Sequence, residues 1–270
     1  MAKGKSWSRD ELLIVLNIYE KLPFGLFDQR QRVIQQVAER LGRTSSSVAM
    51  KLGNLASLDP VLHARGRKGL PGASKLDREA WNEFQADKEK VAAESEAKLR
   101  LLFGAGENDD LEVIKDCGVQ LRHSPLEPRT PPSIETSVPA QVVARRGQQY
   151  FRQIVINAYD AKCCITGLPL RDLLVASHIL PWSSSTESRL DQRNGLCLNR
   201  LHDAAFDQGL ITLDDDLRVV VSPSVRSAYN SSAVVSQFLA YEGTRISAPE
   251  GDLAPNPRFI AHHREEIFKS

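Results

Sequence analysis

Three short stretches in the second half of the chain decide its fold: ASHILPW at residues 176–182, NGLCL at 194–198 and LHDAAFDQG at 201–209. The apolar run 173–179 predicts a short strand that has His178 near its end. Residues 199–208 predict a helix that carries Asp203, and Asn194 lies in the chain between these two elements. The pattern therefore gathers a histidine, an asparagine and a carboxylate within a short span of sequence.

These residue types suit the hydrolysis of a phosphodiester bond with one metal ion. The His178 imidazole, with an ordinary pKa of about 6.5, can take a proton from water at neutral pH. The Asn194 amide can hold the chain or the imidazole in place. Asp203 and Asp207 offer the hard oxygen ligands that Mg²⁺ and Mn²⁺ prefer. The metal then stabilises charge on the leaving oxygen.

Residues 141–221 resemble the HNH endonuclease family, which has the ββα-metal fold, and specifically one bacterial subfamily of it. The resemblance covers nearly half of the chain and rests on a combination of short motifs. These motifs are RGQ at 146–148 with FR at 151–152, Cys163 with TG at 166–167, ASHI-x-PW at 176–182, NGL at 194–196, FD-x-GLI at 206–211, and HRE at 263–265 with Phe268.

The resemblance implies that His178 is the general base and that Asn194 braces the site. It places the helical metal ligand of the family at position 203. It also implies one divalent metal ion, Mg²⁺ or Mn²⁺ rather than Zn²⁺, and double-stranded DNA as the partner.

Two positions differ from the best-known pattern of the family. Ser177 stands where an Asp or a His precedes the first histidine and binds metal, and serine is a poor metal ligand. His202 immediately precedes Asp203, so either side chain can be the helical ligand. Asp207 follows Asp203 by one helical turn and shares its face. We expect Asp203 to be the ligand, with His202 and Asp207 as equal alternatives.

Several other reactive side chains have simpler interpretations. Cys163, Cys164 and Cys197 could bind zinc, but the chain has no CxxC pair, and we expect buried thiols. Trp182 is expected to pack. The two histidines at 262 and 263 either cap the terminal helix or approach a phosphate.

The net charge of +1 hides an uneven distribution. Residues 1–75 carry 13 Lys and Arg against 6 Asp and Glu, and residues 76–116 carry 6 against 12. A basic module on a near-neutral remainder suits binding to a polyanion. The alternative is a solvated basic face that has no partner.

Residues 7–58 predict three short helices. Ser8 caps the first, and Glu11 completes a capping box. The corner at 41–44 resembles a helix-turn-helix, in which residues 44–57 form the recognition helix. We expect DNA contacts from this helix, its corner and the basic loop 64–72, through Arg43, Ser46, Ser47, Lys51, Asn54, Arg65, Arg67 and Lys68. The alternative is a structural three-helix bundle.

The remaining elements predict an α+β fold. Residues 76–102 predict one long charged helix. Apolar runs at 162–166 and 173–179 predict two strands around a turn, and 211–213 with 218–221 predict a second hairpin. We divide the chain into an all-α, helix-turn-helix-like DNA-binding module at 1–104, a linker at 105–140, and an HNH domain with extra helices at 141–270.

We therefore expect a metal-dependent DNA endonuclease of the restriction or defence type. Double-strand cleavage by single-strand sites requires two copies, which favours a homodimer. Four arginines are expected to hold the DNA backbone near the site: Arg152, Arg189, Arg193 and Arg200. The alternatives are a catalytically weakened HNH-like scaffold that binds DNA, and a non-specific nuclease of RNA or single strands.

The sequence also bears on location. No stretch approaches the roughly 18 apolar residues of a membrane span. The N-terminus, MAKGKSWSRDE, has no apolar signal core, and four cysteines are too few for a disulfide framework. We expect a cytoplasmic protein that has no membrane partner.

Overall fold

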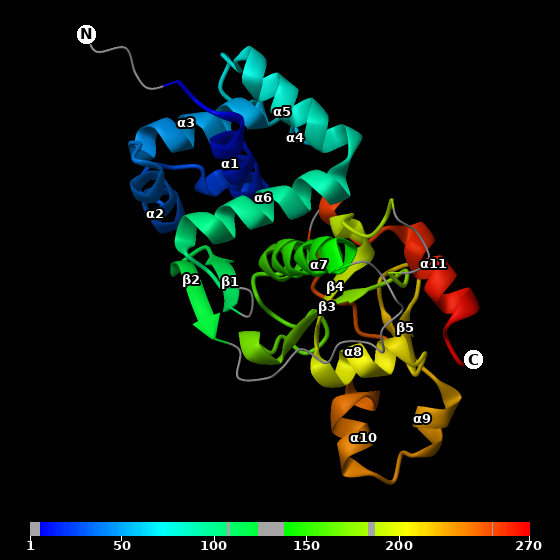
Figure 1. Cartoon of the computed structure of the whole chain (residues 1–270). Coiled ribbons are helices and arrows are strands. Elements are labelled where there is room, and N and C mark those ends of the chain that lie inside the picture. Colours follow the sequence, from blue (N-terminus) through cyan, green and yellow to red (C-terminus); the bar gives the residue numbers. More distant parts are fainter. Residues whose placement is uncertain (1–5, 107–108, 124–137, 183–186, 250) are drawn as a thin grey trace. The chain divides into compact units, whose positions relative to one another are not determined.

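The computed structural model describes residues 6–106, 109–123, 138–182, 187–249 and 251–270 (Figure 1). The chain forms two compact units, Met1–Gln153 and Ile154–Ser270. In the part of the chain that the structure describes, no helix combines the length and the apolar character that a membrane span requires.

Helix α1 (Arg9–Lys21) is the centre of the first unit. It contacts α3 (Ser45–Ala56), α5 (Lys75–Ala86) and α6 (Lys88–Phe103), which leaves almost all of its side chains buried (Figure 1). The predicted capping box is present, because the Ser8 hydroxyl accepts from the Glu11 N–H and the Glu11 carboxylate accepts from the Ser8 N–H.

The corner between the second and third helices forms as the sequence predicts. Helix α2 (Arg32–Leu41) ends at Gly42, whose φ of 63° lies in the left-handed region that favours glycine. Thr44 then caps α3 by accepting from the Ser47 N–H. Two short elements complete this part of the unit, η1 (Phe24–Leu26) and α4 (Pro60–Ala64).

The single charged helix expected at 76–102 is wrong, because α5 and α6 are separate helices that meet at Asp87. Asp87 has a φ of −144° and a ψ of 77°, and its carboxylate accepts from the Lys90 N–H at 3.1 Å. A short side chain that bonds nearby backbone competes with helix continuation, so this aspartate starts a new helix.

The stretch expected to be a linker contains a β-hairpin. Strands β1 (Asp109–Ile114) and β2 (Gly118–His123) pair in antiparallel register. On α7 (Val138–Ala158), the Gln153 side chain accepts from the Val113 N–H at 3.1 Å and donates to the Leu111 carbonyl, as a neighbouring strand would. This side chain, far along the chain, satisfies the open edge of β1.

The second unit contains a ββα arrangement. Strand β3 (Leu174–His178) pairs with β4 (Gly195–Asn199), and α8 (Arg200–Asp207) packs on both strands. The strand expected at 162–166 is wrong. Residues 164–166 form a turn, in which the Gly167 N–H donates to the Cys163 carbonyl at 2.8 Å. The partner of β3 is therefore β4 and not the segment just before the turn.

The expected hairpin beyond α8 is confirmed as β5 (Ile211–Leu213) and β6 (Val219–Val221). Helix α11 (Pro257–Glu266) packs against β5. Cys163, Cys164 and Cys197 are buried and belong to no disulfide, as predicted. The remaining short helices are η2 (Arg171–Leu173), η3 (Gln192–Asn194), α9 (Pro223–Ser227), α10 (Ser232–Gln237), η4 (Leu239–Tyr241) and η5 (Gly251–Leu253).

Candidate active site

His178 occupies the last position of β3, directly opposite Gly195 at the start of β4. Its Nε2 lies 3.0 Å from the carbonyl oxygen of Arg189. A carbonyl can only accept a hydrogen bond, so the neutral ring carries its hydrogen on Nε2, and Nδ1 is the basic nitrogen. Burial lowers the pKa of His178, and the bond to the Arg189 carbonyl opposes part of this effect. The imidazole is therefore held as a neutral base at physiological pH.

Asn194 fixes the connection between the two strands through its side-chain hydrogen bonds. Its side-chain oxygen accepts from the Leu180 N–H at 2.8 Å. Its amide nitrogen donates to the Ser188 carbonyl at 3.1 Å and to the Leu180 carbonyl at 3.3 Å. The side chain is 1% exposed. These bonds hold both ends of the loop that carries the Arg189 carbonyl, and so they position the His178 ring indirectly.

Two carboxylates from one face of α8 share a cleft with His178. The cleft has a volume of about 470 Å³ and is lined by His178, Ser177, Asp203 and Asp207, among others. Burial raises the pKa of Asp203, whereas the Ser177 hydroxyl and the charge of Arg200 lower it. Burial and then the Asp203 charge raise the pKa of Asp207 to about 6. Desolvation is thus the main cause of both shifts, and the neighbouring carboxylate adds to the shift of Asp207.

Ser177 places a buried hydroxyl beside Asp203 in this cleft. The residue is 3% exposed, and its hydroxyl lowers the pKa of the Asp203 carboxyl. The cleft lining therefore combines two carboxylates, an imidazole and a hydroxyl, which suits a polar ligand.

The structure corrects the expectation that His202 can be the helical metal ligand. His202 is 1% exposed, and the residues that line the cleft do not include it. Its Nδ1 lies 3.0 Å from the Asn199 side-chain oxygen and its Nε2 lies 2.8 Å from the Gln237 carbonyl. Adjacent helical side chains point about 100° apart, so Asp203 faces the cleft while His202 joins α8 to the segment after α10.

His263 also lines the cleft, but it is part of the structural framework. Its Nε2 donates to the Phe206 carbonyl at 3.0 Å, and its Nδ1 accepts from the Thr212 hydroxyl at 2.9 Å. Burial lowers the pKa of His263 to about 4. The neutral ring also stacks on Phe206, with 3.6 Å between ring centroids. His263 therefore holds α11 against the end of α8. The sequence left open whether His263 caps the terminal helix or approaches a phosphate, and in the structure its ring instead joins α11 to Phe206 and Thr212.

The four arginines expected near the backbone have different environments. Arg189 donates to the Trp182 carbonyl at 2.8 Å, and its guanidinium lies 5.2 Å from the centre of the Trp182 ring. Arg193 pairs with Asp191, and Arg200 is exposed at the first position of α8. Arg152 belongs to the first unit. Arg189 and Arg200 are thus the arginines that the structure connects with the cleft.

The donor set fits a divalent cation that takes oxygen ligands. Among the described residues, no group of three or more His, Cys, Asp or Glu side chains is arranged to hold an ion. Asp203 and Asp207 instead provide two carboxylates on one helix face, with the buried Ser177 hydroxyl in the same cleft. Mg²⁺ is commonly bound by one or two carboxylates, and water and phosphate oxygens supply the rest of its shell.

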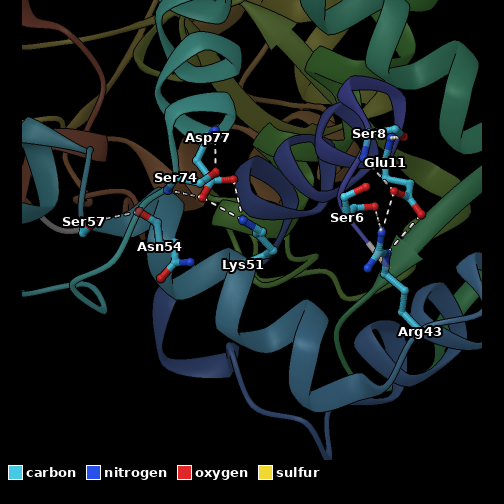
Figure 2. Close-up of polar contacts among 9 residues, drawn as sticks. All are labelled: Ser6, Ser8, Glu11, Arg43, Lys51, Asn54, Ser57, Ser74 and Asp77. Carbon is cyan, nitrogen blue, oxygen red and sulfur yellow. Dashed lines mark hydrogen bonds and ion pairs between the residues drawn. The ribbon is translucent and has the colours of Figure 1, made fainter. Parts of the chain in front are cut away.

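The expected DNA contacts on α3 and its corner are largely corrected. Arg43 pairs with Glu11 at 2.8 Å and lies over Trp7, and its side chain is 6% exposed (Figure 2). Lys51 donates to both carboxylate oxygens of Asp77, at 2.7 and 2.8 Å. Asn54 is 7% exposed. The charges of Arg43 and Lys51 thus have partners on other helices of the first unit, and Asn54 is buried beside them on α3.

The other expected DNA contacts remain on the surface. Ser46 is exposed and Ser47 is partly exposed on α3. Arg65, Arg67 and Lys68 are exposed on the loop after α4. The basic loop thus presents its cations to solvent, as the sequence suggested.

Sequence reasoning missed two contributors to the site. The Arg189 carbonyl, which orients His178, is a backbone atom and has no signal in the sequence. His263 and Ile267 line the cleft from α11 and the residue after it, far from the strand that carries His178. A signal for them did exist, because the segment around His263 is one of the motifs that resemble the family.

Comparison with known proteins agrees with this geometry. No curated protein matches the chain. The model of the HNH endonuclease family matches residues 163–214, a range that contains β3, β4, α8 and β5. Residues 163–214 are thus similar to the HNH endonuclease domain, and this similarity suggests nuclease activity.

Proposed function

We propose that the protein is a DNA endonuclease that depends on a divalent metal and serves in restriction or defence. One observation carries the proposal: His178, Asp203 and Asp207 line a single cleft of the ββα arrangement that matches the HNH family. HNH nucleases generally use a divalent metal. The restriction role rests on the resemblance of the short motifs to one bacterial subfamily.

In the proposed reaction, His178 Nδ1 accepts a proton from the attacking water. The Arg189 carbonyl keeps the other ring hydrogen on Nε2, and Asn194 keeps that carbonyl in place. Asp203 and Asp207 would hold the metal, with Asp203 as the more enclosed of the two side chains. A bound Mg²⁺ or Mn²⁺ supplies charge stabilisation to the leaving oxygen.

The test is nicking of supercoiled plasmid with Mg²⁺, with Mn²⁺ and with EDTA. His178→Ala is expected to lower the rate by about 10²–10⁴-fold, the usual contribution of a general base. His262→Ala is the matched control, since it removes an exposed imidazole outside the cleft lining. Equal rates for wild type and His178→Ala, or cutting that persists in EDTA, would contradict the proposal. Plasmid with and without base methylation tests the restriction role.

A DNA-binding scaffold without catalysis is the second candidate. It is favoured by Ser177 at a position where the family commonly binds metal, and by the absence of a three-ligand group among the described residues. Calorimetric titration with Mn²⁺ separates the two. Binding that Asp203→Asn weakens supports the nuclease, whereas a protein that binds duplex DNA but no Mn²⁺ is the scaffold.

A further inference from the structure

The outer face of α3 differs from the polar face that the sequence suggested. Lys51 reaches Asp77 (Figure 2) and Asn54 is buried. The exposed stripe of this helix is therefore formed by Ser46 and Met50, one helical turn apart. Met50 is 54% exposed. A large apolar side chain thus stands on the face where DNA contacts were expected.

The loop after α4 extends this apolar face. Leu70 donates its N–H to the Gly53 carbonyl of α3 at 2.8 Å. A Cβ at Gly53 would lie 2.7 Å from Leu70 Cδ1, and a Cβ at Gly69 would lie 2.1 Å from the Ser57 nitrogen. These glycines allow the loop to lie directly on α3. Leu70 remains 49% exposed, and Met50 precedes Gly53 by three residues, so both apolar side chains belong to one face.

The segment 44–78, which contains α3 and the loop after α4, exposes more cations than carboxylates. Residues 44–78 contain two carboxylates, and both have internal partners. Asp77 accepts from Lys51 and from the Ser74 N–H, and Asp59 accepts from the Tyr19 hydroxyl and caps α4. The exposed cations of the segment are Arg65, Arg67, Lys68, Lys75 and Arg78. One of these, Lys75, lies 3.6 Å from Glu79 just beyond the segment.

The basic loop has a fixed backbone. The Arg67 N–H donates to the Leu62 carbonyl at 3.0 Å, and the Gly66 N–H donates to the His63 carbonyl at 2.9 Å. Gly66 has a φ of 69°, which favours glycine at this turn. The cations of the loop are therefore presented beside α3 by an ordered chain, which lowers the entropic cost of binding.

We propose that Met50 and Leu70 contact the C5-methyl groups of thymine in the major groove of DNA, while Arg67 and Lys68 bind the adjacent phosphates. The inference rests on the proposed function, because it takes duplex DNA as the substrate. An α-helix fits the major groove, and an apolar side chain is the usual contact for the thymine methyl. The exposed cations Arg67 and Lys68 favour a polyanion over a protein as the occupant of this face.

The experiment measures binding without cleavage, with the full-length His178→Ala protein in EDTA. One long PCR product is made with dTTP and again with dUTP, so that only the thymine methyl groups differ. Competition between the two products is expected to favour the thymine product by about fourfold for each methyl group buried. Met50→Gln and Leu70→Gln are expected to remove this preference. Val235→Gln, at an exposed valine of α10, is the matched control and keeps it.

A second arm tests the basic loop. Arg67→Gln is expected to weaken binding to both products equally and to reduce the slope of affinity against salt by about one counterion. Circular dichroism confirms that each variant is folded, which is expected because the substituted side chains are exposed.

Three results would overturn the inference. Equal binding of the two products by the parent protein would exclude methyl contact. A thymine preference that Met50→Gln and Leu70→Gln leave unchanged would place the contact elsewhere. A change of oligomeric state in Met50→Gln, with DNA binding intact, would assign the face to a protein partner. Because cleavage is not measured, these results differ from failure of the nuclease itself, which would appear as no metal-dependent nicking by the wild type.

Discussion

Helices α3 and α8 each carry a polar face on which the sequence places a function, and the fold uses the two faces in opposite ways. On α3, Lys51 and Asn54 are turned into the protein. On α8, Asp203 and Asp207 line an open cleft. Both helices are amphipathic and both begin at a side-chain cap, so helical periodicity does not distinguish them.

The two helices differ in whether their charged side chains have an ion-pair partner. Lys51 meets the fully buried carboxylate of Asp77, which is itself held by the cap of α5. The structure shows no ion pair for Asp203 or Asp207 among the residues that it describes. A buried charge is retained only when it is paired, whereas carboxylates that face each other without a cation are suited to bind one. The comparison teaches that a polar helix face is functional where the fold leaves its charges uncompensated.

The substitution with the largest expected effect removes the ion pair between Lys51 of α3 and Asp77. Lys51→Met leaves the Asp77 carboxylate buried and uncompensated, and we expect the free energy of unfolding to fall by about 3–5 kcal/mol. The neighbouring substitution Met50→Gln is expected to change it by no more than about 0.5 kcal/mol, because Met50 is exposed. Urea denaturation of the full chain measures both. Equal effects at the two positions would mean that the inward and outward faces of α3 are misassigned.

A second effect concerns the framework that holds α8. His263 has a pKa of about 4 in the folded protein against about 6.5 when unfolded. Between about pH 4 and about pH 6.5 the His263 ring is protonated in the unfolded state but neutral in the folded state. The contribution of this residue to stability is therefore fully present above about pH 6.5 and is lost as the pH falls toward about 4. The loss is on the order of 3 kcal/mol.

The measurement is the free energy of unfolding as a function of pH for wild type and His263→Gln. The variant is expected to be less stable at neutral pH and to lose this part of the pH dependence. His262→Gln serves as control and is expected to keep it, since His262 is exposed. A wild-type stability that is flat across this window would contradict the buried neutral state of His263.

The third effect tests the open face of α8. Asp203→Asn is expected to lower metal-dependent cleavage by about 100-fold, because it removes a charged ligand from the cleft. Plasmid nicking with saturating DNA and varied Mn²⁺ measures the rate and the metal requirement together. Asp216→Asn, an exposed carboxylate of the β5–β6 turn, is the matched control. The assignment of Asp203 fails if both variants lose the same activity.

The smallest expected effect tests whether His202 or its neighbour Asp203 is the metal ligand of α8. His202→Gln loses ring contacts to Asn199 and Gln237, and we expect a destabilisation of about 1–3 kcal/mol. Its affinity for Mn²⁺, measured by calorimetry on folded protein, is expected to equal that of the wild type. A loss of Mn²⁺ affinity as large as that of Asp203→Asn would instead make His202 the helical ligand.

The fold was predictable from sequence where hydrogen bonds are local. The Ser8 and Glu11 capping box, the stop at Gly42 and the β5–β6 hairpin follow from residues within a few positions of each other. Predictions failed where a partner comes from far along the chain. The pairing of β3 with β4 and the edge contact of Gln153 on β1 are of this kind.

The sequence by itself determined which side chains are available for chemistry: His178, Asn194 and the two carboxylates of α8, on a strand, a connection and a helix. Only the tertiary structure decided how they are used. It turned His202 away and Asp203 toward the cleft, brought the Arg189 carbonyl to His178, and gave Lys51 a buried partner. The physical reason is that local periodicity sets the identity and spacing of side chains, whereas desolvation and ion pairing depend on contacts between distant segments.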